Sequence, residues 1–276
     1  MEPTLLECVI NISEGSDPSV IAELNRAAGK SLLDTHSDPF HNRSVFTLYG
    51  LNVYRDAFAL AEKAFELLDL SRHEGVHPRI GVLDVVPFVP IGDTWFSEAL
   101  EARENFAREI STKFSVPVFL YGPNRTLPQI RREAFKTLEP DFGPPEPHPR
   151  YGSVAVGARG LLVAYNLYLV GHDLDQAKLV AKEVRSHCFR TLGLRVGKQV
   201  QVSANLVDPL NHGIYEFYTA VSRLSTISKG ELVGLAPLKT IDETPKRLWR
   251  TLDLSKDKAL EIRASAIGLG PSDRRA

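Results

Sequence analysis

Five prolines fall within the ten residues from Pro140 to Pro149, and this segment constrains the fold more than any other stretch. Proline fixes φ and lacks a backbone N–H, so we expect an irregular connector instead of a helix or a central strand. A chain of 276 residues also suits two domains of about 100 to 150 residues each. We therefore predict a first domain at 1–145, a second at 146–245 and a C-terminal extension at 246–276.

Strand-like and helix-like patterns alternate on both sides of this connector. Before it, strands are expected at 5–13, 31–35, 45–49, 82–89 and 116–121, and helices at 18–28, 53–68 and 97–114. After it, strands are expected at 154–156, 161–169 and 200–206, helices at 174–188 and 213–224, and a last apolar stretch at 232–238. This alternation predicts layered α/β sandwiches, and the short connection from Thr35 to Ser44 permits a split β-α-β arrangement.

Composition excludes several classes of protein. The 33 basic and 34 acidic residues nearly cancel, so we expect neither nucleic acid nor a membrane surface as a partner. Cys8 and Cys188 are the two cysteines and form no C-x-x-C pair, which predicts neither a disulfide framework nor a thiolate zinc site, and favours a reducing, cytoplasmic location. We expect no export signal or membrane span, since the densest apolar stretch, 161–169, is far shorter than about 20 residues.

Four of the eight histidines gather in two loops. They are His36 and His41 in one loop and His73 and His77 in the other. His77 differs from the others because it lies between a Glu-Gly turn and the stiff Pro78–Arg79 pair, just before a strand expected to be buried. A fixed imidazole with a pKa of about 6.5 is the natural proton carrier at neutral pH. For the other three, a solvated loop residue is an equally good interpretation.

Residues 73–77 also spell H-E-x-x-H, the zinc-peptidase pattern, and Glu98 lies where a third ligand can occur. Such a site requires both histidines on one helical face. Gly75 weakens a helix by about 1 kcal/mol, and Pro78 moves the preceding residue away from the α region. The helix dipole already explains an acid at the start of a helix, the position expected for Glu98. We therefore predict neither a metalloprotease nor a bound metal.

Short strings follow one another in a fixed order between Leu5 and Leu238. They are Glu7–Val9, Asn11–Gly15, His41–Val45, Gly75–Arg79, Val86–Pro90, Pro140–Pro144, Gly157–Arg159, Ala164–Asn166, Gln201–Ser203, Asn205–Leu206, Glu231–Leu235 and Pro237–Leu238. This series resembles the glutamate formiminotransferase family, the transferase unit of formiminotransferase-cyclodeaminase without the cyclodeaminase domain.

The resemblance implies an α/β (α+β) fold of two similar split β-α-β sandwich subdomains facing across a groove. It implies that 1–145 is the N-terminal formiminotransferase subdomain with the catalytic histidine and 146–245 the C-terminal one. The implied reaction, in histidine degradation and one-carbon metabolism, passes the formimino group of N-formiminoglutamate to N5 of the co-substrate tetrahydrofolate. Closure of the product ring would then require another protein.

The resemblance also assigns residues. The histidine of the Gly-x-His-Pro-Arg string maps onto His77 as the general acid–base. The folate-binding stretch maps onto Gly143, Pro144, Pro145, Glu146, Pro147, His148, Pro149, Arg150, Tyr151 and Gly152. Both substrates carry carboxylates, which favour bidentate arginine contacts, and the candidates within the matched strings are Arg43, Arg79 and Arg159.

The chain departs from the family pattern at two positions. Family members usually carry an acid immediately before the catalytic histidine, where this chain has Val76, and an aspartate where it has His36. Asp34, Asp38 or Glu74 could then orient the catalytic imidazole. A formyltransferase that uses 5-formyltetrahydrofolate and a non-catalytic folate-binding protein are the alternative functions. A homodimer stays open as the oligomeric state.

Overall fold

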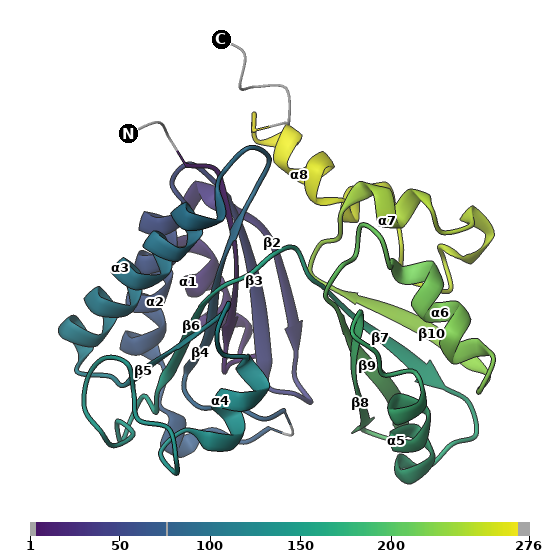
Figure 1. The fold of residues 1–276 in the computed structure, drawn as a ribbon, viewed down its shortest axis with the longest axis horizontal. Helices are drawn as coiled ribbons and strands as arrows, with labels where there is room; N and C mark the ends of the chain where they lie inside the picture. The colour runs from purple at the N-terminus through teal and green to yellow at the C-terminus, as the bar shows by residue number, and fades with distance from the viewer. Residues whose placement is uncertain (1–3, 76, 270–276) are drawn as a thin grey trace. The chain divides into compact units, whose positions relative to one another are not determined.

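The computed structural model of the chain describes residues 4–75 and 77–269 (Figure 1). Contacts between residues divide the chain into two compact units, Met1–Arg159 and Gly160–Ala276. Each unit has its own β-sheet and its own hydrophobic core, so each is described by itself.

The first unit has a six-stranded sheet in the order β2-β3-β1-β4-β6-β5. Along the chain its elements are β1 (Leu6–Ile12), α1 (Pro18–Ala27), β2 (Leu32–Asp38), β3 (Arg43–Gly50), α2 (Val53–Leu67), β4 (Leu83–Pro90), α3 (Phe96–Phe114), β5 (Val118–Tyr121), α4 (Leu127–Glu133) and β6 (Val154–Ala158). β1 pairs antiparallel with β3 and β4, and β3 pairs antiparallel with β2. β6 pairs parallel with both β4 and β5. The first four strands thus form a split β-α-β arrangement, with one strand inserted between each helix-joined pair.

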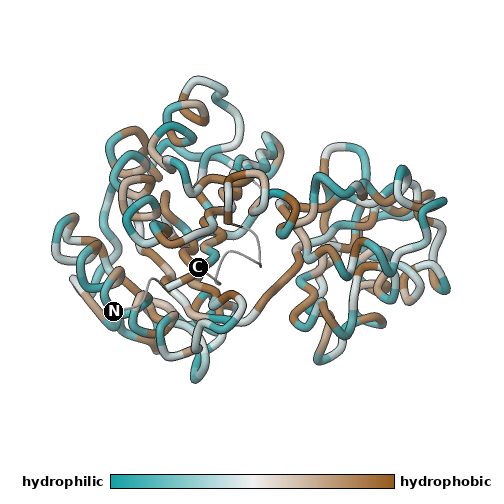
Figure 2. Tube along the Cα trace, turned by 90° about the horizontal axis from the view of Figure 1, so that it is seen from above, coloured by the Kyte–Doolittle hydropathy of each residue, from teal (hydrophilic) through white to brown (hydrophobic). Residues whose placement is uncertain are grey.

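Helices α1, α2 and α3 cover one face of this sheet, and α4 covers part of the other (Figure 1). The alternation of side chains along β4 shows this, because Val86 and Phe88 belong to the core formed with α1–α3, whereas Val85 packs with Ile130 of α4. Hydrophobic and hydrophilic positions alternate along the helices in Figure 2, as expected of elements with one buried face. None of the helices among the described residues has the length and apolar character needed to cross a membrane.

The second unit repeats the same topology with four strands. Its elements are β7 (Val163–Leu169), α5 (Leu174–Glu183), β8 (Phe189–Val196), β9 (Gln199–Leu206), α6 (Ile214–Ser222), β10 (Ile227–Val233), α7 (Leu238–Asp242) and α8 (Leu260–Ala266). The sheet order is β10-β7-β9-β8, and all neighbouring strands are antiparallel. The α/β fold of two similar split β-α-β subdomains is therefore confirmed.

The start of the second unit differs from the predicted boundary between residues 145 and 146. β6 comes after that boundary in sequence, yet it pairs with β4 on one side and β5 on the other. It therefore belongs to the interior of the first sheet, and the connector that precedes it packs within the first unit. Because strand order in a sheet depends on pairings between distant segments, proline density alone could not place the boundary.

Several elements of the structure were not predicted, and one helix is shorter than predicted. The helix expected at 174–188 ends at Glu183, and the strand β8 begins at Phe189. A turn separates them, because the Ser186 N–H donates to the Phe189 carbonyl at 3.0 Å. Helices α4 and α7 were not predicted either, and the apolar stretch expected at 232–238 overlaps β10 only at its end. α8 lies within the expected C-terminal extension, of which residues 270–276 lie outside the described part.

Candidate active site

A buried carboxylate holds together the region around the loop of residues 73–81. The side chain of Asp84, on β4, is fully buried and accepts hydrogen bonds from Arg43 Nη1 at 2.5 Å and Arg131 Nη2 at 2.6 Å. It also accepts the backbone N–H of Ile80 at 2.8 Å. Burial alone would raise the pKa of Asp84, but the two guanidinium groups lower it below its usual range. The ionised carboxylate therefore ties β3, β4 and α4 to the loop.

The imidazole of His77 is held in one tautomer by its neighbour. Its Nδ1 lies 2.7 Å from the carbonyl oxygen of Pro78, which can only accept, so Nδ1 carries the proton and Nε2 keeps its lone pair. Arg131 donates to the same carbonyl. Burial, followed by the positive charges of Arg43 and Arg131, lowers the pKa of His77 to about 3. At neutral pH this side chain is therefore an uncharged base.

A second histidine lies against His77. The ring centroids of His41 and His77 are 5.8 Å apart with the planes at 86°, an edge-to-face contact. His41 Nδ1 pairs with Asp38 at 3.1 Å. Burial alone would raise the pKa of Asp38, but hydrogen bonds from His41 lower it to about 2. The Nε2 atom of His41 is buried and has no hydrogen-bond partner among the described residues, so it is a polar atom that a substrate could satisfy.

Arg79 holds the histidine loop in place. Its Nη2 donates to the carbonyl oxygens of His77 at 2.7 Å and His41 at 3.2 Å, and its Nη1 contacts the ring of His73. The Nε2 of His73 lies 2.9 Å from the carbonyl of Asn42. The described residues between 73 and 79 form no helix, and the two histidines of the H-E-x-x-H string have separate backbone partners. The two imidazoles therefore do not lie on one helical face, the arrangement that a zinc-peptidase string requires.

Arg159 lies at the end of β6, beside a buried tyrosine. Burial raises the pKa of Tyr121 to about 12, against the opposing charge and hydrogen bond of Arg159. The Tyr121 ring lies directly over Gly157, where a Cβ atom would come within 2.2 Å of it. Arg131 and Arg43 also interact electrostatically with Tyr121, so three guanidinium groups from β3, α4 and β6 surround this phenol.

The stretch Gly143–Gly152 runs from the end of α3 to the histidine loop. A Cβ atom on its first glycine would come within 2.5 Å of Ser111 on α3, and one on its last glycine within 2.3 Å of the Ile80 carbonyl. Between them, the rings of His148 and Tyr151 stack with centroids 4.3 Å apart. The structure thus brings the end of this stretch to the loop that carries His77, whereas its beginning lies against another element.

Several site features depend on residues that the sequence did not single out. Asp84 had a signal, because it is an acid within a run of apolar strand residues and must find a partner if it is buried. Arg131 had none, since no motif surrounds it and its helix was not predicted. Of the two departures from the family pattern, His36 lies on β2 opposite Val45, and Val76 lies outside the described residues.

Comparison with known proteins agrees with this architecture. A family profile described as the formiminotransferase domain, N-terminal subdomain, matches residues 5–159, which end where the first unit ends. The chain belongs to the formiminotransferase family. It is 33% identical to the glutamate formimidoyltransferase of Streptococcus pyogenes serotype M1 over 290 residues, covering 93% of this chain and 97% of that protein. It is 31% identical to the glutamate formimidoyltransferase of Thermoplasma acidophilum, covering 88% of this chain and 91% of that protein.

Longer members of the formiminotransferase family match over part of their length. The formimidoyltransferase-cyclodeaminase of Gallus gallus is 33% identical over 313 residues, which cover 96% of this chain and 57% of that protein. The matched family and these relatives identify the chain as a transferase.

Proposed function

We propose that this formiminotransferase passes the formimino group of N-formiminoglutamate to N5 of tetrahydrofolate. N5 attacks the amidine carbon and forms a C–N bond, which gives a tetrahedral intermediate with a proton on N5. That proton leaves N5, the glutamate nitrogen gains one, and the bond from carbon to that nitrogen breaks. The products are 5-formiminotetrahydrofolate and glutamate.

The catalytic assignment depends on a single observation, the contact of His77 Nδ1 with the Pro78 carbonyl, which leaves the lone pair on His77 Nε2. We assign to this atom the proton taken from N5 and then delivered to the departing nitrogen. The Pro78 carbonyl fixes the ring in the tautomer that a general base requires, at 2.7 Å from Nδ1. A positioned acid–base group of this kind contributes about 10²- to 10⁴-fold to the rate.

The charge around His77 gives a reason why its basicity would increase when substrate binds. Arg43 and Arg131 contribute to its low pKa of about 3. A substrate carboxylate bound near these guanidinium groups would offset their charge and raise the pKa of the imidazole. We assign carboxylate binding to Arg43, Arg131 and Arg159. Arg79, which sequence similarity also suggested, donates to two backbone carbonyls and is assigned to positioning the loop.

We further propose that the first unit supplies the catalytic histidine and that Gly143–Gly152 binds the folate. The close approach of the last glycine of this stretch to the Ile80 carbonyl supports that assignment, because Ile80 lies in the same loop as His77. A folate held there would lie near the reacting imidazole. Holding two substrates together can lower the activation barrier by several kcal/mol, and ideal alignment lowers it by about 7–11 kcal/mol.

The proposal is tested by turnover of N-formiminoglutamate with tetrahydrofolate. The parent protein is expected to form the 5-formimino product, and His77→Ala to lose about 10²- to 10⁴-fold in kcat. His172→Gln, in the loop between β7 and α5, is the matched control and is expected to retain full activity. Equal turnover by His77→Ala and the parent would remove His77 from its role.

The same assay separates the alternatives. Turnover of 5-formyltetrahydrofolate in place of the formimino pair would indicate a formyltransferase. Folate binding measured by calorimetry, with no turnover of either one-carbon substrate, would indicate a binding protein.

A further inference from the structure

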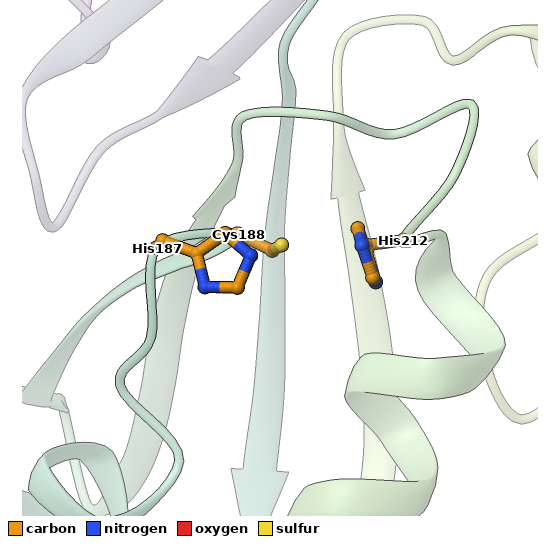
Figure 3. A group of neighbouring side chains, drawn as sticks. All are labelled: His187, Cys188 and His212. Carbon is orange, nitrogen blue, oxygen red and sulfur yellow. The ribbon is translucent and has the colours of Figure 1, made fainter.

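A second cluster of histidines lies in the second unit, outside the site described above. His187 and Cys188 lie between α5 and β8, and His212 lies between β9 and α6. One donor atom from each residue lies within 4.8 Å of the others. Figure 3 shows the Cys188 sulfur directed toward His212, with the His187 ring beside it. Among the described residues, these are the three His, Cys, Asp or Glu side chains that lie close enough together to hold a metal ion.

The backbone that presents His187 and Cys188 is held in a tight turn. The Ser186 hydroxyl accepts the N–H of Cys188 at 3.2 Å and of Phe189 at 3.1 Å. The Ser186 N–H donates to the Phe189 carbonyl, and the Cys188 carbonyl accepts the N–H of Val207 on the β9 side. These hydrogen bonds fix the backbone of His187 and Cys188 before an ion binds. Less conformational entropy is then lost when the site forms.

His212 is oriented by a carboxylate. Its Nδ1 lies 3.0 Å from Glu216, one turn into α6, so the Nδ1 proton is directed to that carboxylate and Nε2 keeps its lone pair. Metal-binding histidines almost always donate their second ring N–H to a carboxylate, a carbonyl or water. Glu216 therefore supplies the outer partner that a metal-binding His212 would need.

We propose that His187, Cys188 and His212 bind one zinc-class divalent transition metal ion. A thiolate and two imidazoles are the donors that suit such ions, and three protein ligands leave a coordination position for water or a further group. The low cysteine content excludes a site with several thiolate ligands, but this site needs only one thiolate because two imidazoles supply the other ligands. No sequence motif marks the group because His212 follows Cys188 only after two strands.

The surroundings of the cluster favour a cation. Cys188 is 4% exposed, and a Glu216 carboxylate oxygen lies 3.0 Å from His212 Nδ1. This carboxylate would stabilise a bound divalent ion. His187 is exposed, which gives an ion access to the cluster.

Titration of Co²⁺ into the metal-free, full-length protein tests the site. We expect one ion per chain, with a thiolate-to-cobalt charge-transfer band that added Zn²⁺ abolishes. Cys188→Ser is expected to lose the band. Glu216→Gln alters only the carboxylate that orients His212 and is expected to weaken Zn²⁺ binding roughly 10- to 100-fold. His187→Gln, at an exposed position, removes a ligand and is expected to weaken Zn²⁺ binding by more than that. His172→Gln is the matched histidine control and is expected to bind like the parent.

The outcomes are distinct. Absence of Co²⁺ binding, binding without a thiolate band, or parental Zn²⁺ affinity in either ligand variant overturns the proposal. Circular dichroism of each variant shows whether it is folded, and His187→Gln keeps the test valid if Cys188→Ser does not fold. The readout is metal binding, so it is independent of the transferase assay.

Discussion

At the scale of single residues, the arrangement around Asp84 balances charges that would be unfavourable alone. Two guanidinium groups and one backbone N–H converge on a carboxylate with no exposed surface. Removing one member of a buried ionic group leaves the remaining charges unpaired, which is far more costly than losing an exposed pair. The same carboxylate accepts the Ile80 N–H and so fixes the loop that carries His77, the proposed catalytic residue.

We expect Asp84→Asn to lower the free energy of unfolding by roughly 3–5 kcal/mol, because Arg43 and Arg131 keep their charges and lose their counter-ion. Urea unfolding at neutral pH measures the change. The matched control is Asp175→Asn, since Asp175 pairs with Lys178 at 3.0 Å but its side chain is 87% exposed. The control is expected to change stability by at most about 1 kcal/mol. Similar losses in both variants would mean that the Asp84 pairs contribute no more than an exposed one.

Sequence reasoning at this scale succeeded where neighbours along the chain define the environment. His77 was singled out because proline and glycine flank it, and its ring is in fact fixed by the adjacent Pro78 carbonyl. Its catalytic role stays a prediction. The lowered pKa of His77 could not be predicted from the sequence, because it depends on burial and on Arg43 and Arg131, which lie on two other elements.

At the scale of elements, the pairing of β5 with β6 leaves room for the Tyr121 ring only because Gly157 has no side chain. Gly157 on β6 pairs with Tyr121 on β5, and the space that a Cβ would need is occupied by the aromatic ring. A methyl group here would have to displace a buried tyrosine that interacts with Arg159. Glycine is therefore required by close approach, independently of its backbone freedom.

Gly157→Ala is accordingly expected to cost about 1–3 kcal/mol of stability through overpacking and to reduce transferase turnover by moving Tyr121. Gly160→Ala serves as its control, because a Cβ at that position meets nothing within 4 Å. Thermal unfolding and the formimino-transfer assay give the two readouts. Parental stability in Gly157→Ala would show that the ring moves aside without cost.

Element prediction failed where local pattern and tertiary pairing disagree. The stretch from Leu174 to Cys188 was predicted as one helix, but it ends at Glu183 since the Ser186 turn redirects the chain into β8. β8 is an edge strand with several exposed positions, so it lacks the apolar run that identified the central strands. By contrast, α1 was predicted, and Asp17 caps it by accepting the Ser19 N–H at 2.8 Å.

At the scale of the whole molecule, the two units have separate cores, and the first includes β6. A fragment of residues 1–159 is therefore expected to fold cooperatively on its own. A fragment of residues 1–145 lacks the strand between β4 and β5, which would leave two buried edges unpaired, and it is expected to aggregate or to lose cooperative unfolding. Urea denaturation followed by circular dichroism compares the two. Equal cooperativity would contradict the placement of β6 in the first core.

The sequence by itself determined the α/β class, most strands and helices, the family and the loop that carries the candidate catalytic histidine. The class and the elements follow from hydrophobic periodicity, capping and turn residues, which act between neighbours in the chain, whereas the family follows from the resemblance of the short strings. Only the tertiary structure decided that β6 lies between β4 and β5, that Arg131 reaches Asp84, and that His212 meets Cys188. Each of these depends on strand pairing or helix packing between distant segments, for which no local pattern of residues is diagnostic.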